Sequence, residues 1–387
     1  MRAVGITVEY NPFHNGHSHH AKEAKHHAQA NAVVAVMSGH FVQRGEPAIV
    51  DKWTRTTMAL QNGVDIVIEL PYVFSTAVAP RFASGAIALL DAMQCSAFAF
   101  GNEQGEAKQF YHTLALLKEH QQHYQALIHQ AVKQGLSYPR AMAYAFTSIT
   151  KQQDVIDLTM PNNILGFHYI EAAVAQNSTM QALTIPRIAS AYHDASFTHE
   201  SIASATAIRK ALFTGQPIEN FVPPTSAALL RQKTKVTWDD YYPYLRHTLL
   251  QWPPEFIATF ADVNEGIEFA LWRAAKKATT FNDFITLVTS KRYTTARIQR
   301  MLTHILVGVT QKERDACVAP SYIRLLGMTS TGQAYLRTVK KQLTLPLISR
   351  VGKQQDPMLA LDCKATQIYQ LAASQHYNDF TAPPIII

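Results

Sequence analysis

The sequence predicts an α/β protein in which a doubly wound parallel sheet is followed by a mainly helical, basic region. Short apolar runs alternate with helical patterns over the first two hundred residues, which is typical of βα units that feed a parallel sheet. Beyond Pro217 the strand signals fade and helical patterns dominate. We therefore expect an α/β domain over residues 1–220 and a mainly helical domain over residues 221–387.

The first elements are predicted from three apolar runs and the helical patterns between them. Residues 3–8 form the first strand, and residues 32–37 (AVVAVM) are apolar throughout, as in a strand buried on both faces. Residues 64–70 form the third strand, which a proline ends. The helix over 17–29 is rich in His, Lys and Ala, and the helix over 51–61 begins with an aspartate cap and closes at Asn-Gly.

The alternation continues over the next hundred residues. A helix is expected over residues 83–92 and a strand over 97–100. The stretch 106–150 is helical in pattern, with many Gln, His and Ala. A Pro-Asn-Asn break precedes a helix over 164–175, and residues 182–185 form the fifth strand.

The last part of the chain combines helical patterns with positive charge. Its clearest helices are predicted over residues 264–278, 295–309 and 365–375. From Phe281 to Lys353 there are twelve Lys and Arg against three acidic residues. This charge indicates either a polyanion-binding surface or a solubilising one. The residues expected on a nucleic-acid backbone, with a solvated helix face as the alternative, are Lys291, Arg292, Arg297 and Arg300.

Composition excludes several classes of protein. Hydrophobic residues make up 47% of the 387 positions, which is typical of an ordered globular chain. Cys95, Cys317 and Cys363 lie far apart, so neither a disulfide framework nor a zinc finger is expected. No signal segment or membrane-spanning run is evident. We expect a cytoplasmic protein with no membrane association, no protein-held metal and no stable protein partner.

The strongest chemical signal lies in residues 7–17, TVEYNPFHNGH, where a strand enters a tight turn and opens a helix. Such a junction directs backbone N–H groups and the positive helix end at an anion. The imidazoles of His14 and His17 flank a glycine that lets a ligand approach, so they can hydrogen-bond phosphate oxygens. A second cluster, residues 201–209, offers hydroxyls and a guanidinium at another helix start, a polyphosphate grip without Walker glycines.

The two clusters, HNGH at 14–17 and SATAIR at 204–209, resemble the motifs of the HIGH-type nucleotidyltransferase superfamily. There the first motif stabilises the ATP phosphates and the second holds the leaving pyrophosphate. Residues 5–17, 38–52, 65–71 and 202–210 further resemble the bacterial tRNA(Met) cytidine acetate ligase family. That resemblance implies that residues 1–220 form an ATP-binding, HIGH-type Rossmann-like domain and residues 221–387 a tRNA-binding domain.

The resemblance also implies a reaction. Acetate is activated with ATP to acetyl-adenylate with release of pyrophosphate, and the acetyl group passes to the wobble cytidine of elongator tRNA(Met), giving N4-acetylcytidine. His14, His17 and Arg209 are the catalytic residues, and Mg²⁺ is expected with ATP. The implied ATP-binding residues are Thr7, Val8, Glu9, Tyr10, Asn11, Pro12, Phe13, His14, Asn15, Gly16, His17, His20, Gly101, Asn162, Arg187, Ser204 and Thr206.

Some of these residues have plainer interpretations without the resemblance. Gly101 is then a turn glycine after a strand, and Asn162 and Arg187 are a helix cap and a surface charge. The spacing of His14, His17 and His20 is that of metal ligands, but the carboxylate partner of an HExxH motif is absent. The polar strip of Ser38-Gly39, Gln43-Arg44 and Asp51-Lys52 either covers the acetate or the base or forms a structural loop.

The chemistry needs little from activating side chains. Acetate is already an anion and can attack the α-phosphate directly, so charge neutralisation and alignment suffice. The cytosine amine is a weak nucleophile that must be splayed out of the anticodon stack. The sequence names no general base for it, and the phosphate of the departing AMP is a candidate.

Other functions fit only part of these motifs. A nucleotidyltransferase that adenylylates a small phosphorylated metabolite needs about one α/β domain, and the basic helical extension would then have no task. A nucleic-acid-binding adaptor would not need both motifs intact. An acetyl-CoA-dependent acetyltransferase is disfavoured because the chain has no Gly-rich pyrophosphate loop of the Q/RxxGxG/A kind.

Overall fold

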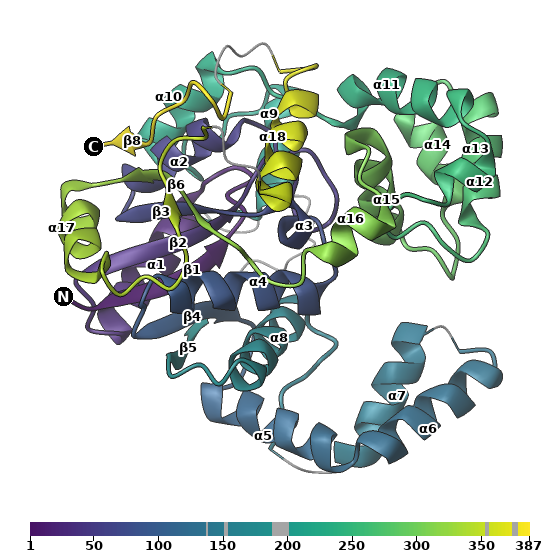
Figure 1. Cartoon of the computed structure of the whole chain (residues 1–387). Coiled ribbons are helices and arrows are strands. Elements are labelled where there is room, and N and C mark those ends of the chain that lie inside the picture. The colour runs from purple at the N-terminus through teal and green to yellow at the C-terminus, as the bar shows by residue number, and fades with distance from the viewer. Residues whose placement is uncertain (137, 151–153, 188–200, 353–355, 374–377) are drawn as a thin grey trace.

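The computed structural model describes residues 1–136, 138–150, 154–187, 201–352, 356–373 and 378–387 (Figure 1). Their strands form one sheet in the order β5-β4-β1-β2-β3-β6-β7, and β8 pairs with β6. Neighbouring strands are parallel except for the antiparallel pair β3 and β6. The strand bounds are β1 Ala3–Val8, β2 Ala32–Ser38, β3 Ile66–Leu70, β4 Ala97–Asn102, β5 Gln181–Pro186, β6 Ile323–Met328, β7 Leu347–Ile348 and β8 Ile385–Ile386. The five strands predicted before residue 220 are confirmed.

Helices follow the predicted patterns with shifted ends. Over residues 106–150 the structure has three helices, and the helix predicted over 83–92 begins four residues earlier. The bounds of the helices before residue 220 are α1 Asn15–His27, α2 Lys52–Leu60, α3 Tyr72–Ser75, α4 Ala79–Ala92, α5 Ala107–Glu119, α6 Gln121–Lys133, α7 Tyr138–Thr150, α8 Pro161–Ala175 and α9 Ala205–Thr214. The later helices are α10 Pro224–Gln232, α11 Trp238–Gln251, α12 Pro254–Ile257, α13 Ile267–Lys277, α14 Phe281–Val288, α15 Thr295–Val307, α16 Gln311–Ala316, α17 Ser330–Val339 and α18 Pro357–Tyr369.

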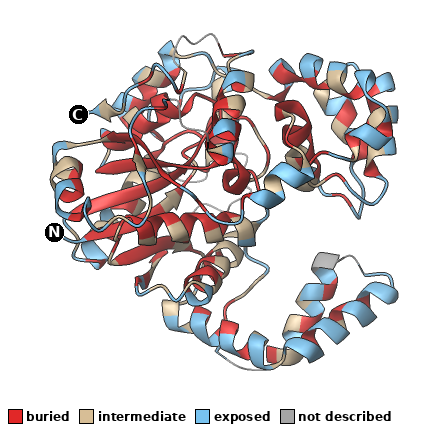
Figure 2. Ribbon diagram, viewed as in Figure 1, coloured by how far each residue is buried: buried red, intermediate tan, exposed pale blue. Residues whose placement is uncertain are grey.

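The sheet is buried on both faces, which explains its continuous apolar strands. Side chains of β2 alternate between two cores, with Val34 and Val36 in one and Val33 and Ala35 in the other. Helix α4 packs in the first core and α1 in the second, and Figure 2 shows the central strands buried throughout. The packing on the α4 side is close, since a Cβ at Gly5 would lie 2.4 Å from Leu90 Cδ2. This close contact fixes β1 against α4.

The chain reverses its winding at β1, and this places the first motif. The chain passes from β1 through α1 to β2 on one side, whereas β4 returns to pair with β1 on the other side. Open α/β sheets bind ligands at the carboxyl ends of strands at such a switch point. The first motif follows the carboxyl end of β1.

The region after residue 220 contains a group of helices and also returns to the sheet. Helices α11, α13, α14 and α15, which we call the helical lobe, pack on one another beside the sheet (Figure 1). Helix α10 instead packs on α2, in the α/β part. The prediction that strands fade after Pro217 is wrong for β6, which pairs with β3 inside the main sheet. The division into two domains at residue 220 stays a prediction.

A buried charge explains why β6 was not predicted. Arg324 interrupts the apolar run of this strand, and a charged residue usually indicates a solvent-facing position. Here its side chain is 1% exposed, it stands opposite Glu69 in the pairing of β3 and β6, and its Nη2 lies 3.5 Å from Asp379 Oδ1. The helix predicted over 365–375 is also partly wrong, because α18 begins at Pro357 and ends at Tyr369. The last two predicted positions lie outside the described residues.

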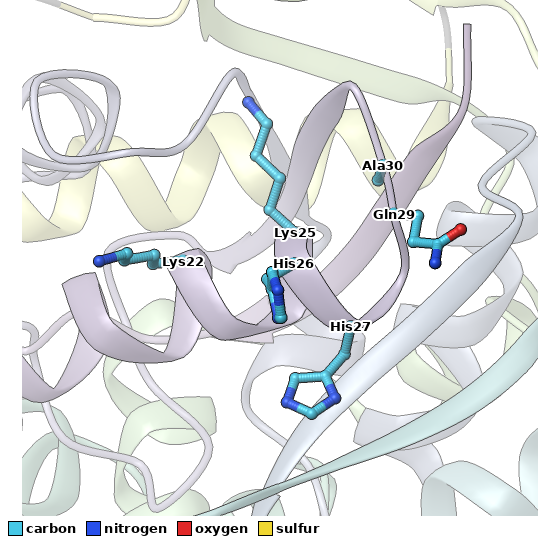
Figure 3. A pocket seen from close by; sticks show the side chains of 6 residues that line it. All are labelled: Lys22, Lys25, His26, His27, Gln29 and Ala30. Atoms are coloured by element: carbon cyan, nitrogen blue, oxygen red, sulfur yellow. The ribbon is translucent and has the colours of Figure 1, made fainter.

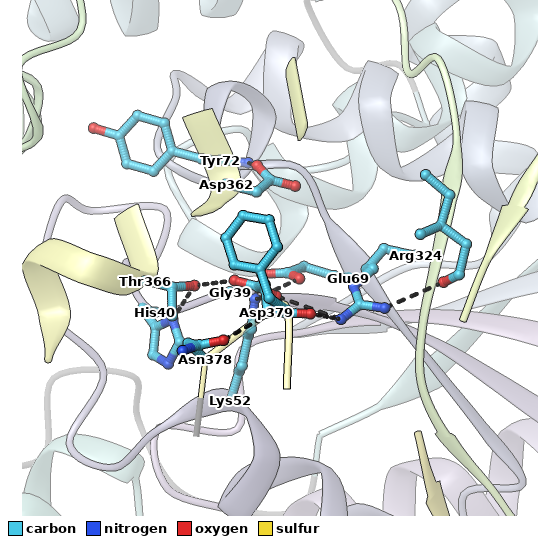
Figure 4. Close-up of polar contacts among 12 residues, drawn as sticks. Gly39, His40, Lys52, Glu69, Tyr72, Arg324, Asp362, Thr366, Asn378 and Asp379 are labelled. Atoms are coloured by element: carbon cyan, nitrogen blue, oxygen red, sulfur yellow. Dashed lines mark hydrogen bonds and ion pairs between the residues drawn. The ribbon is translucent and has the colours of Figure 1, made fainter. Parts of the chain in front are cut away.

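The C-terminal segment completes a buried polar cluster against α2 and β3 (Figure 4). Lys52 Nζ lies 2.8 Å from both carboxylate oxygens of Glu69 and 2.7 Å from Asp379 Oδ1. All three side chains are at most 5% exposed. Thr366 of α18 also donates to Asp379. Charges so deeply buried are tolerated only when paired, so they tie the end of the chain to the sheet.

Candidate active site

The two histidines of the first motif cap helix α1 with their own side chains. His14 is the N-cap residue, and its Nδ1 accepts from the Gly16 N–H at 3.1 Å. In return the Nδ1 of His17 accepts from the His14 N–H at 3.3 Å, and the two rings stack with centroids 3.7 Å apart. Because each Nδ1 accepts, each neutral ring carries its hydrogen on Nε2. The motif therefore presents two Nε2–H donors.

His14, His17 and His20 are uncharged at neutral pH. Burial, together with the charges of Arg187 and Arg209, lowers the pKa of His14 to about 3. Burial also lowers the pKa of His17 well below its usual value and that of His20 to about 4. The imidazoles thus act as hydrogen-bond donors, and the positive charge near them comes from the two arginines.

Aromatic side chains hold His17 in place from one side. The Tyr10 ring centroid lies 4.9 Å from that of His17 and 4.6 Å from that of Phe13. Phe13 is fully buried, and Val8 fills the core behind the loop. The Tyr10 hydroxyl is buried with no hydrogen-bond partner among the residues the structure covers.

The second motif packs directly on the first, although the two lie far apart in the sequence. Arg209 Nη1 donates to the carbonyl oxygen of Asn11 at 2.8 Å, across 198 positions. Its Nη2 lies 3.3 Å from Glu46 Oε2 and 3.4 Å from Thr206 Oγ1. Ser204 caps α9, with its Oγ accepting from a backbone N–H at 3.0 Å. The structure therefore brings these predicted residues together.

Further hydrogen bonds fix the stretch from Asn11 to Asn15 within the first motif. Asn11 Oδ1 accepts from the Ile49 N–H at 2.8 Å, and the next residue, Pro12, follows through a cis peptide bond. Asn15 Nδ2 donates to the carbonyl oxygens of Ser201 and Asn220, each at 2.9 Å. The stretch before α9 and the segment after it are thus both bound to the start of α1.

A second group of predicted residues lies where β4 and β5 end. It consists of Gly101, Asn162 and Arg187. Arg187 Nη1 donates to Asn162 Oδ1 at 3.4 Å, and a Cβ at Gly101 would lie 3.6 Å from Arg187 Cγ. The Glu103 carboxylate accepts from the Asn162 N–H at 3.1 Å and so caps α8. The charge of Arg187 lowers the pKa of His14, so this second group lies close enough to the first motif to act on it electrostatically.

The end of β1 carries Thr7 and Glu9, and both point to residues that sequence reasoning missed. Thr7 is hydrogen-bonded to the Tyr169 hydroxyl of α8. Glu9 Oε1 accepts from the Gln43 N–H at 2.9 Å, and its carbonyl oxygen accepts from Arg55 at 2.7 Å. The Arg55 guanidinium is fully buried and also donates to the carbonyl of Ser38, at 2.9 Å. Gln43 belongs to the predicted polar strip, whereas Tyr169 and Arg55 were missed because no local motif marks contacts that cross between elements.

The loop Val42–Glu46 joins the site to the helical lobe. Gly45 has φ +80°, and a Cβ there would lie 2.3 Å from the backbone nitrogen of Arg300 in α15. Thr303 Oγ1, also in α15, donates to the Gly45 carbonyl at 2.7 Å. The same loop contacts Glu9 through Gln43 and Arg209 through Glu46. The loop Val42–Glu46 therefore links α15 to both motifs.

The four predicted nucleic-acid-binding residues are placed differently from one another. Lys291 is exposed, whereas Arg292 and Arg297 both pair with Glu265, at 3.1 and 3.2 Å. Arg300 is largely buried, and that burial lowers its pKa. Their role in RNA binding stays a prediction, and Arg300 is the least accessible of them.

A shallow hollow lies at the opposite end of α1 from the motif. It is lined by Lys22, Lys25, His26, His27, Gln29 and Ala30 (Figure 3). Close by, ligand atoms of Glu23, His26 and His27 lie within 4.8 Å of one another. Two lysines on the same hollow oppose a bound cation, and Lys25 Nζ is paired with Asp65 at 3.0 Å. We assign this hollow no part in the site.

The chain is similar to known proteins over its whole length. Residues 1–382 match the HIGH Nucleotidyl Transferase family. The chain is 50% identical to the tRNA(Met) cytidine acetate ligase of Lysinibacillus sphaericus, covering 100% of both chains. It is 45% identical to the enzyme of that name from Bacillus subtilis, covering 96% of this chain and 92% of that one.

Solved structures give the same result. The apo crystal structure of Thermotoga maritima TmcAL superposes with a TM-score of 0.92 at 31% identity, covering 100% of both chains. The form of that protein bound to alpha-thio ATP gives a TM-score of 0.89 at 30% identity, covering 100% of this chain and 99% of that one. Among the described residues, no helix is long and apolar enough to cross a membrane.

Proposed function

The chain belongs to the tRNA(Met) cytidine acetate ligase family of the HIGH nucleotidyl transferases, and from that premise we propose that it makes N4-acetylcytidine in tRNA. Acetate and ATP first give acetyl-adenylate and pyrophosphate. The acetyl group then passes to the wobble cytidine of elongator tRNA(Met). Since that tRNA is a cytoplasmic molecule, we infer the cytoplasm as the place of action.

The observation that carries the proposal is the pair of neutral, Nδ1-anchored imidazoles at the start of α1. Their Nε2–H groups donate to the triphosphate, and the guanidinium of Arg209 supplies positive charge beside them. As an acetate oxygen attacks the α-phosphorus, the bond to the β-phosphate breaks and negative charge moves onto pyrophosphate. Fixed donors aimed at that charge lower the barrier without reorganising.

Acetate activation needs no base in this scheme. A carboxylate is ionised at neutral pH, so the protein has only to bring two anions together and offset their repulsion. The charges of Arg187 and Arg209, which both act on His14, supply that offset. We place the nucleoside part of ATP beside Gly101, Asn162 and Arg187, where β4 and β5 end.

Mg²⁺ is expected with ATP, and the described residues around the motif do not by themselves form a site for it. Magnesium in nucleotide sites is bound by one or two carboxylates together with substrate phosphates. The carboxylates beside the motif are Glu9, which accepts from a backbone N–H, and Glu46, which is paired with Arg209. We therefore assign the ion to the ATP phosphates and derive no step from it.

The tRNA is proposed to approach from the side of α15. Helix α15 contacts the loop Val42–Glu46, so RNA held near the start of this helix lies close to the motifs. Lys291 and Arg292 precede α15 and are exposed, which suits contacts with phosphates. A wobble base splayed from its stack has only a short distance to travel into the site.

The first step can be tested without tRNA. Purified protein with Mg²⁺ is expected to exchange labelled pyrophosphate into ATP only when acetate is present, because the exchange reverses adenylate formation. Propionate and no added acid serve as controls for substrate choice and background. Exchange that needs a phosphorylated metabolite instead of acetate would contradict the proposal and favour a simple nucleotidyltransferase.

A further inference from the structure

Glu9 is a carboxylate in the middle of a motif that binds phosphates. It follows β1 directly, is half-buried, and lies five positions before His14. A fixed negative charge there repels a triphosphate, so ATP binding alone gives no reason for it. A lysine or a neutral residue would serve ATP better, and the position therefore calls for a separate task.

The carboxylate is held firmly by one oxygen only. Oε1 accepts from the Gln43 N–H at 2.9 Å, and the Glu9 carbonyl is fixed by Arg55 at 2.7 Å. Within the described part of the chain, Oε2 has no hydrogen-bond or ion-pair partner. A rigid side chain with one free acceptor oxygen is suited to receive a hydrogen from a ligand.

Glu9 lies in the same electrostatic environment as the phosphate-binding histidine. The charge of Arg209 lowers the pKa of both Glu9 and His14. Arg209 itself bonds the carbonyl of Asn11, between these two residues in the sequence. An acyl group attached to an α-phosphate at His14 is therefore within the neighbourhood of the Glu9 carboxylate.

We propose that Glu9 Oε2 is the base that accepts a proton from the exocyclic N4 amine of the target cytosine during acetyl transfer. The inference rests on the function proposed above. In this step N4 attacks the acetyl carbon of acetyl-adenylate, and a C–N bond forms. The C–O bond to AMP breaks, and AMP leaves with that electron pair. N4 gives one proton to Glu9, which later releases it to water.

The chemistry of cytosine explains why a carboxylate belongs here. The N4 amine presents hydrogens, and Glu or Asp is the side chain that accepts from it in base recognition. The amine is a poor nucleophile whose hydrogens become acidic as it bonds to the acyl carbon, so a positioned base speeds the step. Before that step, the same contact orients the base.

The surroundings of Glu9 adjust its proton affinity towards this role. Burial raises its pKa, the hydrogen bond from the Gln43 N–H opposes that rise, and Glu46 adds to it. The other charged and titratable groups that act on it are Arg44, Arg55, Arg209 and Tyr169. A raised pKa means that the carboxylate holds a transferred proton better.

The loop that holds Glu9 also contacts the side from which RNA is proposed to enter. Gln43 lies in the loop Val42–Glu46, which packs on α15 through Gly45. The Glu9 carboxylate therefore stands between the nucleotide motif on one side and the helical lobe on the other. This is the place where the two substrates must meet.

The test is the variant Glu9→Gln, assayed separately for the two steps. The amide oxygen still accepts from the Gln43 N–H, so the loop keeps its anchor while the base is lost. Because Glu9 is among the implied ATP-binding residues, we expect acetate-dependent pyrophosphate exchange to fall, but by much less than the transfer step. Single-turnover acetyl transfer from acetyl-adenylate to tRNA is expected to fall by about a hundredfold or more. Glu23→Gln, a half-buried carboxylate later in α1, is the matched control and should change neither rate.

The pH profile gives a second readout. In the wild type, protonation of Glu9 removes the base, so the transfer rate should fall as the pH drops through its raised pKa. That acid limb should be absent in Glu9→Gln. Glu9→Asp keeps a carboxylate and should retain more transfer activity than Glu9→Gln, and it decides the matter if the glutamine variant does not fold.

Two results would overturn the proposal. Full transfer activity in Glu9→Gln would leave Glu9 as a loop anchor and favour the AMP phosphate as the base. An equal loss of both steps in folded Glu9→Gln, or in Glu9→Asp, would place Glu9 in ATP use. Failure of the proposed function itself is distinguishable, because wild-type protein would then show no acetate-dependent exchange at all.

Discussion

The residue that best illustrates the site is His17, whose ring is fixed before any ligand arrives. Its Nδ1 is occupied by the His14 N–H, and the Tyr10 and Phe13 rings restrict it from the side. A neutral ring with a fixed tautomer costs little reorganisation when phosphate charge develops. This is an advantage over a mobile lysine at the same place.

Removing this imidazole should separate catalysis from RNA binding. In His17→Ala, adenylate formation is expected to fall by about a hundredfold to a thousandfold, as for the loss of one oxyanion donor. Affinity for tRNA is expected to stay within about twofold, since His17 lies on the nucleotide side of the site. Pyrophosphate exchange and filter binding measure the two quantities. A matching loss of tRNA affinity would contradict this division of roles.

Sequence reasoning succeeds at this scale where the signal is local. His14, Gly16 and His17 lie within four positions and cap one helix, so their pattern alone indicates an anion site. The partner of Glu9 is different, because Gln43 contributes a backbone N–H that any residue type would offer. Contacts of that kind leave no mark in the sequence.

At the scale of elements, the central contact is between the loop Val42–Glu46 and α15. It depends on Gly45, which adopts φ +80° and allows the backbone of Arg300 to approach. Because the loop also bonds Glu9 and Arg209, the position of α15 is tied to that of these two residues.

The variant Gly45→Ala tests that contact. A methyl group there meets backbone atoms that cannot yield, so we expect a loss of about 1–3 kcal/mol in the free energy of unfolding beyond the backbone cost. Gly63→Ala is the matched control, because Gly63 has φ +105° and nothing within 4 Å of an added Cβ. Urea unfolding of both variants measures the difference. Equal destabilisation would show that the α15 contact contributes nothing.

The exposed basic residues before α15 should set the strength of RNA binding. In the double variant Lys291→Glu and Arg292→Glu, tRNA affinity is expected to fall, and its salt dependence to weaken by about one to two counterions. Pyrophosphate exchange should be unaffected. Lys22→Glu, on α1, is a charge-reversal control that changes the net charge by half as much. An unchanged salt slope in the double variant would place the RNA elsewhere.

Helix and strand types were predictable for most elements, and one strand was not. The five apolar strands before residue 220 are continuous runs with turn signals between them, so their pattern is unambiguous. Strand β6 pairs with β3 across more than 250 positions and carries Arg324, whose charge is neutralised only in the folded chain. Long-range pairing of this kind cannot be deduced from a local pattern.

Across the whole molecule, the C-terminal segment ties the helical lobe back to the sheet. The chain leaves the α/β part for helices α11–α15 and returns through β6 to end beside it at β8. The buried ion pairs of Lys52 with Glu69 and Asp379 hold the end of the chain against the sheet. Separating the C-terminal segment from the sheet would expose these charges, so the segment and the sheet are expected to unfold as one cooperative unit.

Breaking the buried cluster should therefore destabilise the protein strongly. Asp379→Ala leaves Lys52 with a single carboxylate partner, and we expect a loss of about 3–5 kcal/mol in the free energy of unfolding. Lys25→Ala is the contrasting control, because its pair with Asp65 is partly exposed and is worth at most about 1 kcal/mol. Chemical denaturation of both variants decides the point. Similar values for the two would argue against the cluster as the closure of the fold.

The central claim is that this chain acetylates tRNA with free acetate and ATP. The most direct measurement incubates the purified protein with ATP, Mg²⁺, ¹⁴C-acetate and bulk bacterial tRNA, and then identifies the labelled nucleoside. We expect label in N4-acetylcytidine that requires ATP and is not diluted by unlabelled acetyl-CoA. Label that is absent, or that depends on acetyl-CoA, would contradict the account.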